Sequence, residues 1–361
     1  MASTGLNNIK NLSFCEDGIN HLRELLYLEV LKFGSIAETM TINYGIWNGK
    51  KIGGIGEFEE IGQDAKMCDP EWNHTNIRTV EEAWKLGVFD ISEELCADDF
   101  EETIAQYAMN TGTRRADLTD TDILSYIIEP RLKLAIEKGI WRYMWFGDTT
   151  AKNIADGGTI TAGKDVKFLK AIDGLFRRLF ALTASEPGQR VTITANSETS
   201  YADQYEAMFE QGAASKVFRD LVYKCDPKLM QMSDKAVWCT QSYANALAED
   251  VKGGNKGSSL QWESLFGGLV YTTEYNGQKI NALPIWDEMI KVYENTGAAL
   301  NKPHRAVFAS KASLLGGCQS SGSMIPDLDI WFSKDSQKNR IKGRELFGTT
   351  LWEPELIQFA Y

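Results

Sequence analysis

The sequence predicts an α+β fold, and three observations support this class. A long helical pattern covers about residues 119–146, strand and helix patterns alternate through residues 190–322, and residues 323–361 contain mainly strand patterns. A chain of 361 residues is long enough for two domains, or for one domain with large excursions. Apolar residues make up 43% and charged residues 24%, which excludes a disordered chain, a collagen and a coiled coil.

The charge balance argues against a nucleic-acid-binding surface that covers the whole protein. The chain has 38 basic and 50 acidic side chains, a formal net charge of −12. Proteins that bind phosphates usually have a basic excess, so this chain should repel nucleic acid on average. No apolar run approaches the ~20 residues of a membrane span, and Met1–Leu6 lack the pattern of a secretory signal. We therefore expect no membrane span and no secretory signal.

The cysteines do not form a metal-binding pattern. The six are Cys15, Cys68, Cys96, Cys225, Cys239 and Cys318. None of them belongs to a C-x-x-C pair, the short spacing that zinc sites normally use. We expect buried free thiols in a reducing compartment.

The N-terminal part is polar, with a weakly amphipathic helical pattern at 18–33, and a glycine-rich region follows it. Residues 41–47 are strand-like, Asn48-Gly49 is a hairpin turn signal, and residues 50–62 combine glycine with alternating charges. Such a segment has too little side-chain mass for a core of its own. We expect a long hairpin that projects from the body, with residues 84–91 as a return strand.

An acidic run from Asp90 to Glu102 favours a solvated helix start. The longest helix is expected from about Thr119 to Trp145, capped by Thr119 or Asp120 and kinked at Pro130. At 1.5 Å per residue this helix would be ~40 Å long, which is more typical of a strut than of an ordinary globular helix.

The break Glu186-Pro187-Gly188-Gln189 indicates a domain boundary at residues 186–189. A basic helix is expected at 166–182 before this break. The alternating elements after it include a hairpin at Asn276-Gly277 and a short helix at 311–316. The tail ends in an apolar strand at 356–361, so we expect this end of the chain to be held in a sheet.

No catalytic, cofactor-binding or metal-binding residue is predicted. His21, His74 and His304 are expected to be surface or capping residues, and the nucleophile pattern G-x-S-x-G is absent. The glycine-rich loop 253–259 lacks the spacing of a phosphate-binding loop. The acidic pairs Asp98-Asp99 and Asp327–Asp329 are expected to be structural, and Lys50 and Lys51 to face solvent. We therefore expect no cofactor and no enzymatic activity.

The order of these elements resembles the major capsid proteins of tailed bacteriophages, whose fold is named after phage Hong Kong ninety-seven. The resemblance is carried by the hairpin segment Asn48-Gly49-Lys50-Lys51, the long helix from Asp120 to Trp145, and the closing strands 329–332 and 356–361. It implies an N-terminal arm at 1–40, an extended loop region at 41–90, and an axial domain at 190–322. The peripheral domain would comprise 91–189 and 323–361, with a spine helix at about 119–146.

The resemblance also implies a function. The chain would be a structural subunit that self-assembles through pentamers and hexamers into the icosahedral head of the virion, in the host cytoplasm. It would enclose double-stranded DNA without sequence-specific binding, and its partners would be scaffolding, portal and decoration proteins. Scaffolding would be a separate protein, or the sequence is a mature form. Some members join subunits through lysine–asparagine isopeptide bonds. Lys50 or Lys51 could supply an amine, but no partner is assigned.

Two other functions remain open from the sequence. The first is the shell of a cellular nanocompartment of the encapsulin type, which has the same fold; such shells are usually shorter, without the stretches 68–83 and 253–258. The second is an α/β carbohydrate-acting enzyme that uses carboxylates and some of the ten tryptophans. The enzyme would be a monomer or small oligomer with an acidic cleft, whereas either shell protein would assemble into closed particles.

Overall fold

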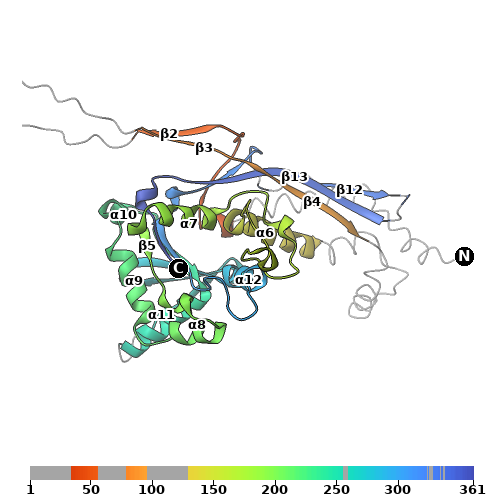
Figure 1. The fold of residues 1–361 in the computed structure, drawn as a ribbon. Coiled ribbons are helices and arrows are strands. Elements are labelled where there is room, and N and C mark those ends of the chain that lie inside the picture. The colour runs from red at the N-terminus through yellow and green to blue at the C-terminus, as the bar shows by residue number, and fades with distance from the viewer. Residues whose placement is uncertain are drawn as a thin grey trace, which may run out of the picture.

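The computed structural model describes residues 34–55, 79–95, 129–254, 259–322, 328–333 and 338–361, together with residues 324 and 335. Within them the chain forms a five-stranded sheet, a seven-stranded sheet and a two-stranded ribbon (Figure 1). Helices lie against both larger sheets, which confirms the predicted α+β class.

The helices are α3 (Gly34–Ala37), α6 (Glu129–Phe146), α7 (Leu175–Ser185), α8 (Tyr201–Met208), α9 (Ala213–Tyr223), α10 (Pro227–Gln231), α11 (Gln241–Gly254) and α12 (Pro284–Tyr293). The strands are β1 (Thr41–Asn43), β2 (Lys51–Ile55), β3 (Thr79–Ala83), β4 (Gly87–Leu95), β5 (Arg190–Val191), β6 (Lys235–Thr240), β7 (Glu263–Leu265), β8 (Val270–Tyr275), β9 (Gln278–Leu283), β10 (Ala306–Ser310), β11 (Leu314–Cys318), β12 (Leu328–Ser333), β13 (Lys338–Leu351) and β14 (Gln358–Ala360).

The five-stranded sheet is organised around β13, its longest strand. Its order is β1-β11-β13-β12, and β4 pairs with the other edge of β13. Successive side chains of β13 point to opposite faces of the sheet, as they do in any β-strand. Ile341 and Phe347 are buried toward the core, whereas Lys342 and Arg344 are exposed. The sheet thus has one apolar face, which needs a covering layer, and one charged face.

Helix α6 supplies that layer (Figure 1). Its buried side chains Ile140, Trp141, Met144 and Trp145 belong to the same hydrophobic core as Phe89 of β4 and Phe347 of β13. Gly139 lies under this strand pair, because a Cβ atom there would stand only 3.2 Å from the Phe89 ring. At ~1.5 Å per residue, the 18 residues of α6 extend about 27 Å. The predicted long helix is confirmed over 129–146; residues 119–128 lie outside the described residues.

The seven-stranded sheet has the order β5-β14-β10-β6-β9-β8-β7. Its central strands β6 and β10 are buried along almost their whole length, and their runs are continuously apolar as fully covered strands require. The predicted Asn276-Gly277 hairpin joins β8 to β9. Asn276 and Gly277 have φ of 49° and 71°, the positive values that a type I′ turn demands.

An aromatic cluster joins the two sheets. Trp286 of α12 lies 4.5 Å from Trp145 of α6 and 4.7 Å from Phe176 of α7, between ring centroids. Phe176 also stacks on Phe359 of β14, with a centroid distance of 6.0 Å. One continuous core therefore fills the space between the five-stranded sheet and one face of the seven-stranded sheet, and a second core lies on the other face.

The structure corrects two expected strand pairings near the N-terminal end of the described chain. Strand β1 pairs in parallel with β11, so Asn48-Gly49 does not close a hairpin between 41–47 and 50–62. The return strand of the projecting hairpin is β3, at 79–83, because residues 87–95 pair with β13 instead.

Three further expectations are corrected. Asp90, Glu93 and Glu94 belong to strand β4 and not to a helix start. The short helix expected at 311–316 is a 3-10 turn at 311–313, after which β11 begins. The expected helix at 166–182 is divided, because α7 begins only at Leu175 after a 3-10 turn at 166–168.

The last strand also differs from expectation. β14 pairs with β10 and β5 in the seven-stranded sheet, so residues 358–360 do not return to the five-stranded sheet. Phe359 explains this location, because its ring packs against Phe180 and Phe176 in the shared core. The expectation that this end is held in a sheet is confirmed, since Ile193 N donates a hydrogen bond to Tyr361 O.

Gly174 offers a test of how closely α6 and α7 are joined. A Cβ atom there would lie 2.7 Å from Gly147 N and 2.8 Å from the Trp145 carbonyl carbon. We predict that Gly174→Ala lowers the free energy of unfolding by about 1–3 kcal/mol, the usual cost of overpacking. Gly188→Ala is the matched control, because nothing lies within 4 Å of its Cβ position. Urea denaturation of both variants measures the difference, and equal stabilities would contradict the close packing.

Candidate functional site: the projecting ribbon and a buried polar cluster

Strands β2 and β3 form an antiparallel ribbon that extends away from the body of the protein (Figure 1). Among the described strands, they pair only with each other. Lys51 Nζ donates a hydrogen bond of 2.6 Å to Glu81, and both side chains are exposed. This bond raises the pKa of Lys51 and lowers that of Glu81. A two-stranded ribbon is marginally stable in water by itself, so these strands depend on what lies next to them.

The base of the ribbon is held by Trp84, whose side chain is 1% exposed. Its ring covers Gly317 of β11, where a Cβ atom would approach the ring to 2.7 Å. Ile46 and Leu315 complete this small core. In the backbone, Trp84 N donates to Lys50 O at 3.0 Å, and Gly49 N donates to Trp84 O at 2.9 Å. The ribbon therefore leaves the body from a fixed base.

Asn48-Gly49 lies at this base and not at the tip of the ribbon. Gly49 has φ of 83°, and Asn48 Oδ1 accepts a hydrogen bond from Leu86 N. Trp47 beside it is 60% exposed, and Lys50 Nζ lies 4.7 Å from the centre of its ring. Lys51 faces solvent as predicted, whereas Lys50 is half-buried against Trp47. The base thus presents an exposed aromatic side chain beside a cation.

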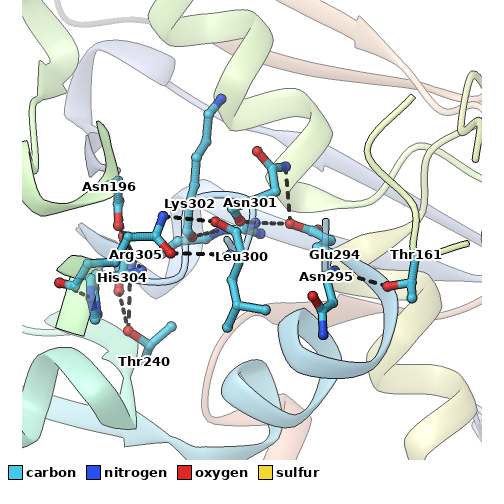
Figure 2. Close-up of polar contacts among 11 residues, drawn as sticks. Thr161, Asn196, Thr240, Glu294, Asn295, Leu300, Asn301, Lys302, His304 and Arg305 are labelled. Atoms are coloured by element: carbon cyan, nitrogen blue, oxygen red, sulfur yellow. Dashed lines mark hydrogen bonds and ion pairs between the residues drawn. The ribbon is translucent and has the colours of Figure 1, made fainter. Parts of the chain in front are cut away.

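A second polar feature is a buried cluster on the segment between α12 and β10 (Figure 2). The Arg305 side chain is fully buried and pairs with Glu294 through Nη2. Its Nε donates to Lys302 O at 2.9 Å, and Nη2 also donates to Asn301 O at 2.9 Å. The guanidinium lies 4.7 Å from the Phe176 ring centroid, a favourable cation–π position. These bonds hold the 294–305 segment against the aromatic cluster between the sheets.

His304 lies beside this cluster and is fully buried, so its predicted surface or capping position is wrong. Its Nε2 faces Gln204 O at 3.3 Å, and its Nδ1 faces Ser242 Oγ at 3.0 Å. A carbonyl only accepts, so Nε2 carries the proton and donates to Gln204 O, and the unprotonated Nδ1 faces the Ser242 hydroxyl, which also donates to Thr240 Oγ1. Burial lowers the pKa of His304 to about 4. The ring is therefore a neutral bridge between α8 and α11. His21 and His74 lie outside the described residues.

Two other carboxylates, one half-buried and one buried, are helix caps that sequence reasoning missed. Asp287 of α12 accepts hydrogen bonds from Gln241 N and Ser242 N at the start of α11, and burial raises its pKa. Asp250 of α11 accepts from Gly212 N and Ser215 N at the start of α9. Each acid is far in sequence from the helix that it caps, so no local pattern could reveal it.

The thiols are poorly suited to nucleophilic chemistry. Cys239 and Cys318 are buried thiols, as predicted, and Cys225 is a half-buried thiol. Burial raises the pKa of Cys239, and burial aided by Glu345 raises that of Cys318 to about 12. A thiol with a raised pKa carries little of the reactive thiolate. Cys15, Cys68 and Cys96 lie outside the described residues.

The described part of the chain brings together no group of three or more His, Cys, Asp or Glu side chains that could hold a metal ion. Asp329 is exposed on β12, and Asp327, Asp98 and Asp99 lie outside the described residues. Residues 255–258 of the predicted glycine-rich loop also lie outside them. None of the helices in the described part combines the length and apolar character that a membrane crossing needs.

Solved structures that match this chain include chains from phages, from a procapsid and from the capsid of a GTA particle. A chain from Gordonia phage Cozz has 11% identity, with coverage of 90% of this chain and 85% of that chain and a TM-score of 0.47. A chain from the satellite phage P4 procapsid, which includes a size determination protein, has 9% identity, coverage of 95% and 96%, and a TM-score of 0.47. The capsid of a native GTA particle gives 12% identity, coverage of 91% and 89%, and a TM-score of 0.48.

No protein-family profile matches the chain, and no curated protein matches it.

Trp84→Ala tests the attachment of the ribbon. Removing this buried ring leaves a cavity over Gly317, so we predict a loss of about 3–5 kcal/mol in the free energy of unfolding. Amide hydrogen exchange should also become faster in residues 51–55 and 79–83. The control is Trp47→Ala, which removes an exposed ring and should change stability by no more than about 0.5 kcal/mol. Unchanged exchange in the ribbon would show that Trp84 does not hold it.

His304 should make stability depend on pH. Its pKa is about 4 in the folded protein and 6.5 in the unfolded chain, so between these values the unfolded chain binds the additional proton. The free energy of unfolding should therefore fall as the pH decreases from 7 to 4, by up to about 3 kcal/mol from this group. His304→Gln should remove this contribution, which urea denaturation at pH 7.5 and 4.5 would measure. The same pH dependence in both proteins would contradict a buried neutral His304.

Proposed function

We propose that this chain is a structural subunit that self-assembles into the icosahedral head of a tailed bacteriophage and encloses its double-stranded DNA. The observation that carries the proposal is the β2–β3 ribbon, which leaves the body from a rigid base and pairs with no other described strand. A protein that worked as a monomer would gain nothing from a projecting ribbon without a core of its own.

Assembly would supply the packing surface that the ribbon lacks within its own subunit. In a symmetric assembly, each copy can cover its neighbour's projecting segment, and every copy receives the same contact. Obligate interfaces of this kind typically bury more than about 2,000 Å². Exposed Trp47 and Tyr44, at the base of the ribbon, provide the aromatic surface that such interfaces favour.

We assign the parts of the shell subunit as follows. The five-stranded sheet with α6 is the peripheral domain, and α6 is the described part of the spine helix. The seven-stranded sheet with α8, α9 and α11 is the axial domain, to which β14 is now added. The N-terminal arm keeps the expected bounds 1–40. The extended loop region, expected at 41–90, begins after β1 and ends before β4, because both strands belong to the five-stranded sheet. The ribbon is the described part of that loop.

The charge of the chain suits a container for DNA. A net charge of −12 per subunit weakens adhesion to phosphates, so DNA would be confined without sequence-specific binding. On the charged face of β13, the cations Lys338 and Arg340 are both paired with Glu94 of β4. We infer a structural protein without enzymatic activity, assembled in the host cytoplasm from pentamers and hexamers. Scaffolding, portal and decoration proteins would be its partners in the virion.

Electron microscopy with light scattering of the purified protein tests the proposal. We expect closed icosahedral particles, or discrete pentamers and hexamers. Particles from the native source that enclose enzymes in place of DNA would favour a nanocompartment shell. A stable monomer that converts a carbohydrate substrate would overturn the assembly proposal.

A ribbon replacement tests the role of β2 and β3. Lys51 and Ala83 are paired neighbours, so Asn-Gly can replace residues 52–82 as a two-residue turn. We predict a folded subunit with a nearly unchanged melting temperature that no longer forms closed particles. The control exchanges the Lys51 and Glu81 charges and keeps the ribbon, so it should still assemble. If the shortened subunit forms normal particles, the ribbon is not an assembly element.

A further inference from the structure

The exposed side of helix α9 carries cations and an aromatic ring. Lys216, Arg219 and Tyr223 are spaced by three and four residues, which puts them on one side of the helix. The opposite side, with Phe218 and Leu221, is buried in the second hydrophobic core. Tyr223 is 80% exposed, the largest exposed fraction among the large hydrophobic side chains of the described residues. This ring therefore takes no part in the core of its own subunit.

The basic character continues from α9 into α10. Residues 213–231 contain four basic and two acidic side chains, in a chain whose net charge is −12. Asp220 is paired with both Arg219 and Lys224, at 3.8 Å and 3.1 Å, so one carboxylate serves two cations. Met230 of α10 is 39% exposed and adds apolar area. We define the basic surface as the exposed side chains of Lys216, Arg219, Tyr223, Lys224 and Met230.

Helix α8 and its ends have the opposite charge. Residues 195–212 contain four acidic side chains and neither lysine nor arginine. Glu206 and Glu210 are exposed, four residues apart, and have no ion-pair partner among the residues that the structure describes. Tyr205 beside them is 44% exposed, and its ring is held by Phe209 at a centroid distance of 4.5 Å. We define the acidic surface as Tyr205, Glu206 and Glu210.

The two surfaces face different directions. In Figure 1, α8 lies at the lower end of the molecule, whereas α9 and α10 lie on its left side. The surfaces are complementary in charge, and each presents an exposed aromatic ring. A contact between two unlike surfaces of identical chains joins the copies head to tail and closes rings. A partner of another kind would account for only one of the two surfaces, so their complementarity favours a second copy of this chain.

We propose that the basic surface of one subunit docks on the acidic surface of the next subunit in a ring. Lys216 and Arg219 pair with Glu206 and Glu210 of the neighbouring copy, and Tyr223 supplies an aromatic anchor beside these pairs. Complementary charges fix the partner and the register of an interface, and buried aromatic side chains supply most of its affinity. The inference rests on the proposed self-assembly, and it names a contact separate from the ribbon.

Two double variants test the contact from its two sides. Lys216→Glu/Arg219→Glu makes the basic surface acidic, and Glu206→Lys/Glu210→Lys makes the acidic surface basic. Each variant alone brings like charges together, so the concentration required for assembly should increase by about tenfold or more. The melting temperature of the isolated subunit should change by no more than about 2 °C, because all four side chains are exposed.

A mixture of the two variants separates the contact from any effect on folding. Each reversed surface is complementary to the reversed surface of the other variant, so an equal mixture should assemble although neither variant assembles alone. The two variants must alternate around a ring, and only a ring with an even number of subunits can then close. Native mass spectrometry of the mixture should therefore show hexamers with equal numbers of the two variants, and no pentamers.

The matched control is Lys164→Glu/Lys170→Glu, which makes the same change in net charge at two exposed lysines between α6 and α7. It should assemble like the unmodified protein, and its failure would show that net charge and not this contact limits assembly. Normal assembly by either test variant alone, or a mixture that stays unassembled, would overturn the inference while the proposed function stands. If the unmodified protein forms no assemblies, the proposed function and this inference fail together.

Discussion

The contact on which the rest of the structure depends is the aromatic cluster around Phe176. Trp145, Trp286 and Phe359 reach this ring from three different elements, α6, α12 and β14. Each large ring buries enough apolar surface to contribute several kcal/mol, and together they fill the space between the sheets. The Arg305 guanidinium closes one side of the cluster and is neutralised by Glu294. The two sheets therefore have one relative position, and not a range of them.

That position determines where the ribbon leaves the molecule. Met144 of α6 belongs to the core below β11. β11 pairs with β1 at one edge, and the Trp84 ring covers its face at Gly317. The ribbon begins one residue before Trp84 and takes its direction from this packing. A projecting ribbon needs such a chain of contacts, because a small angular error at its base becomes a larger displacement at its far end.

Local sequence patterns predicted the elements that are determined by neighbouring residues. The Asn276-Gly277 turn, the C-terminal part of the long helix and the buried strands β6 and β10 follow from turn chemistry and periodicity. The parallel pairing of β1 with β11 and the placement of β14 could not be predicted in this way, because their partners lie far along the chain. The same is true of the buried partners of His304. A histidine that bridges Gln204 and Ser242 gives no signal in its own neighbourhood.

The glycines of β11 and β13 have a consequence for how homologous chains can vary. Met40 packs directly on the backbone of Gly316, and Trp84 packs on that of Gly317. Leu86 packs in the same way on Gly348 of β13. Because each glycine lacks a Cβ atom, it leaves space for one large side chain from a distant segment. A side chain can be added at position 317 only if the ring at position 84 shrinks, so the two positions should covary across related sequences. A search for paired substitutions could then recognise relatives of this protein even where overall identity has been lost.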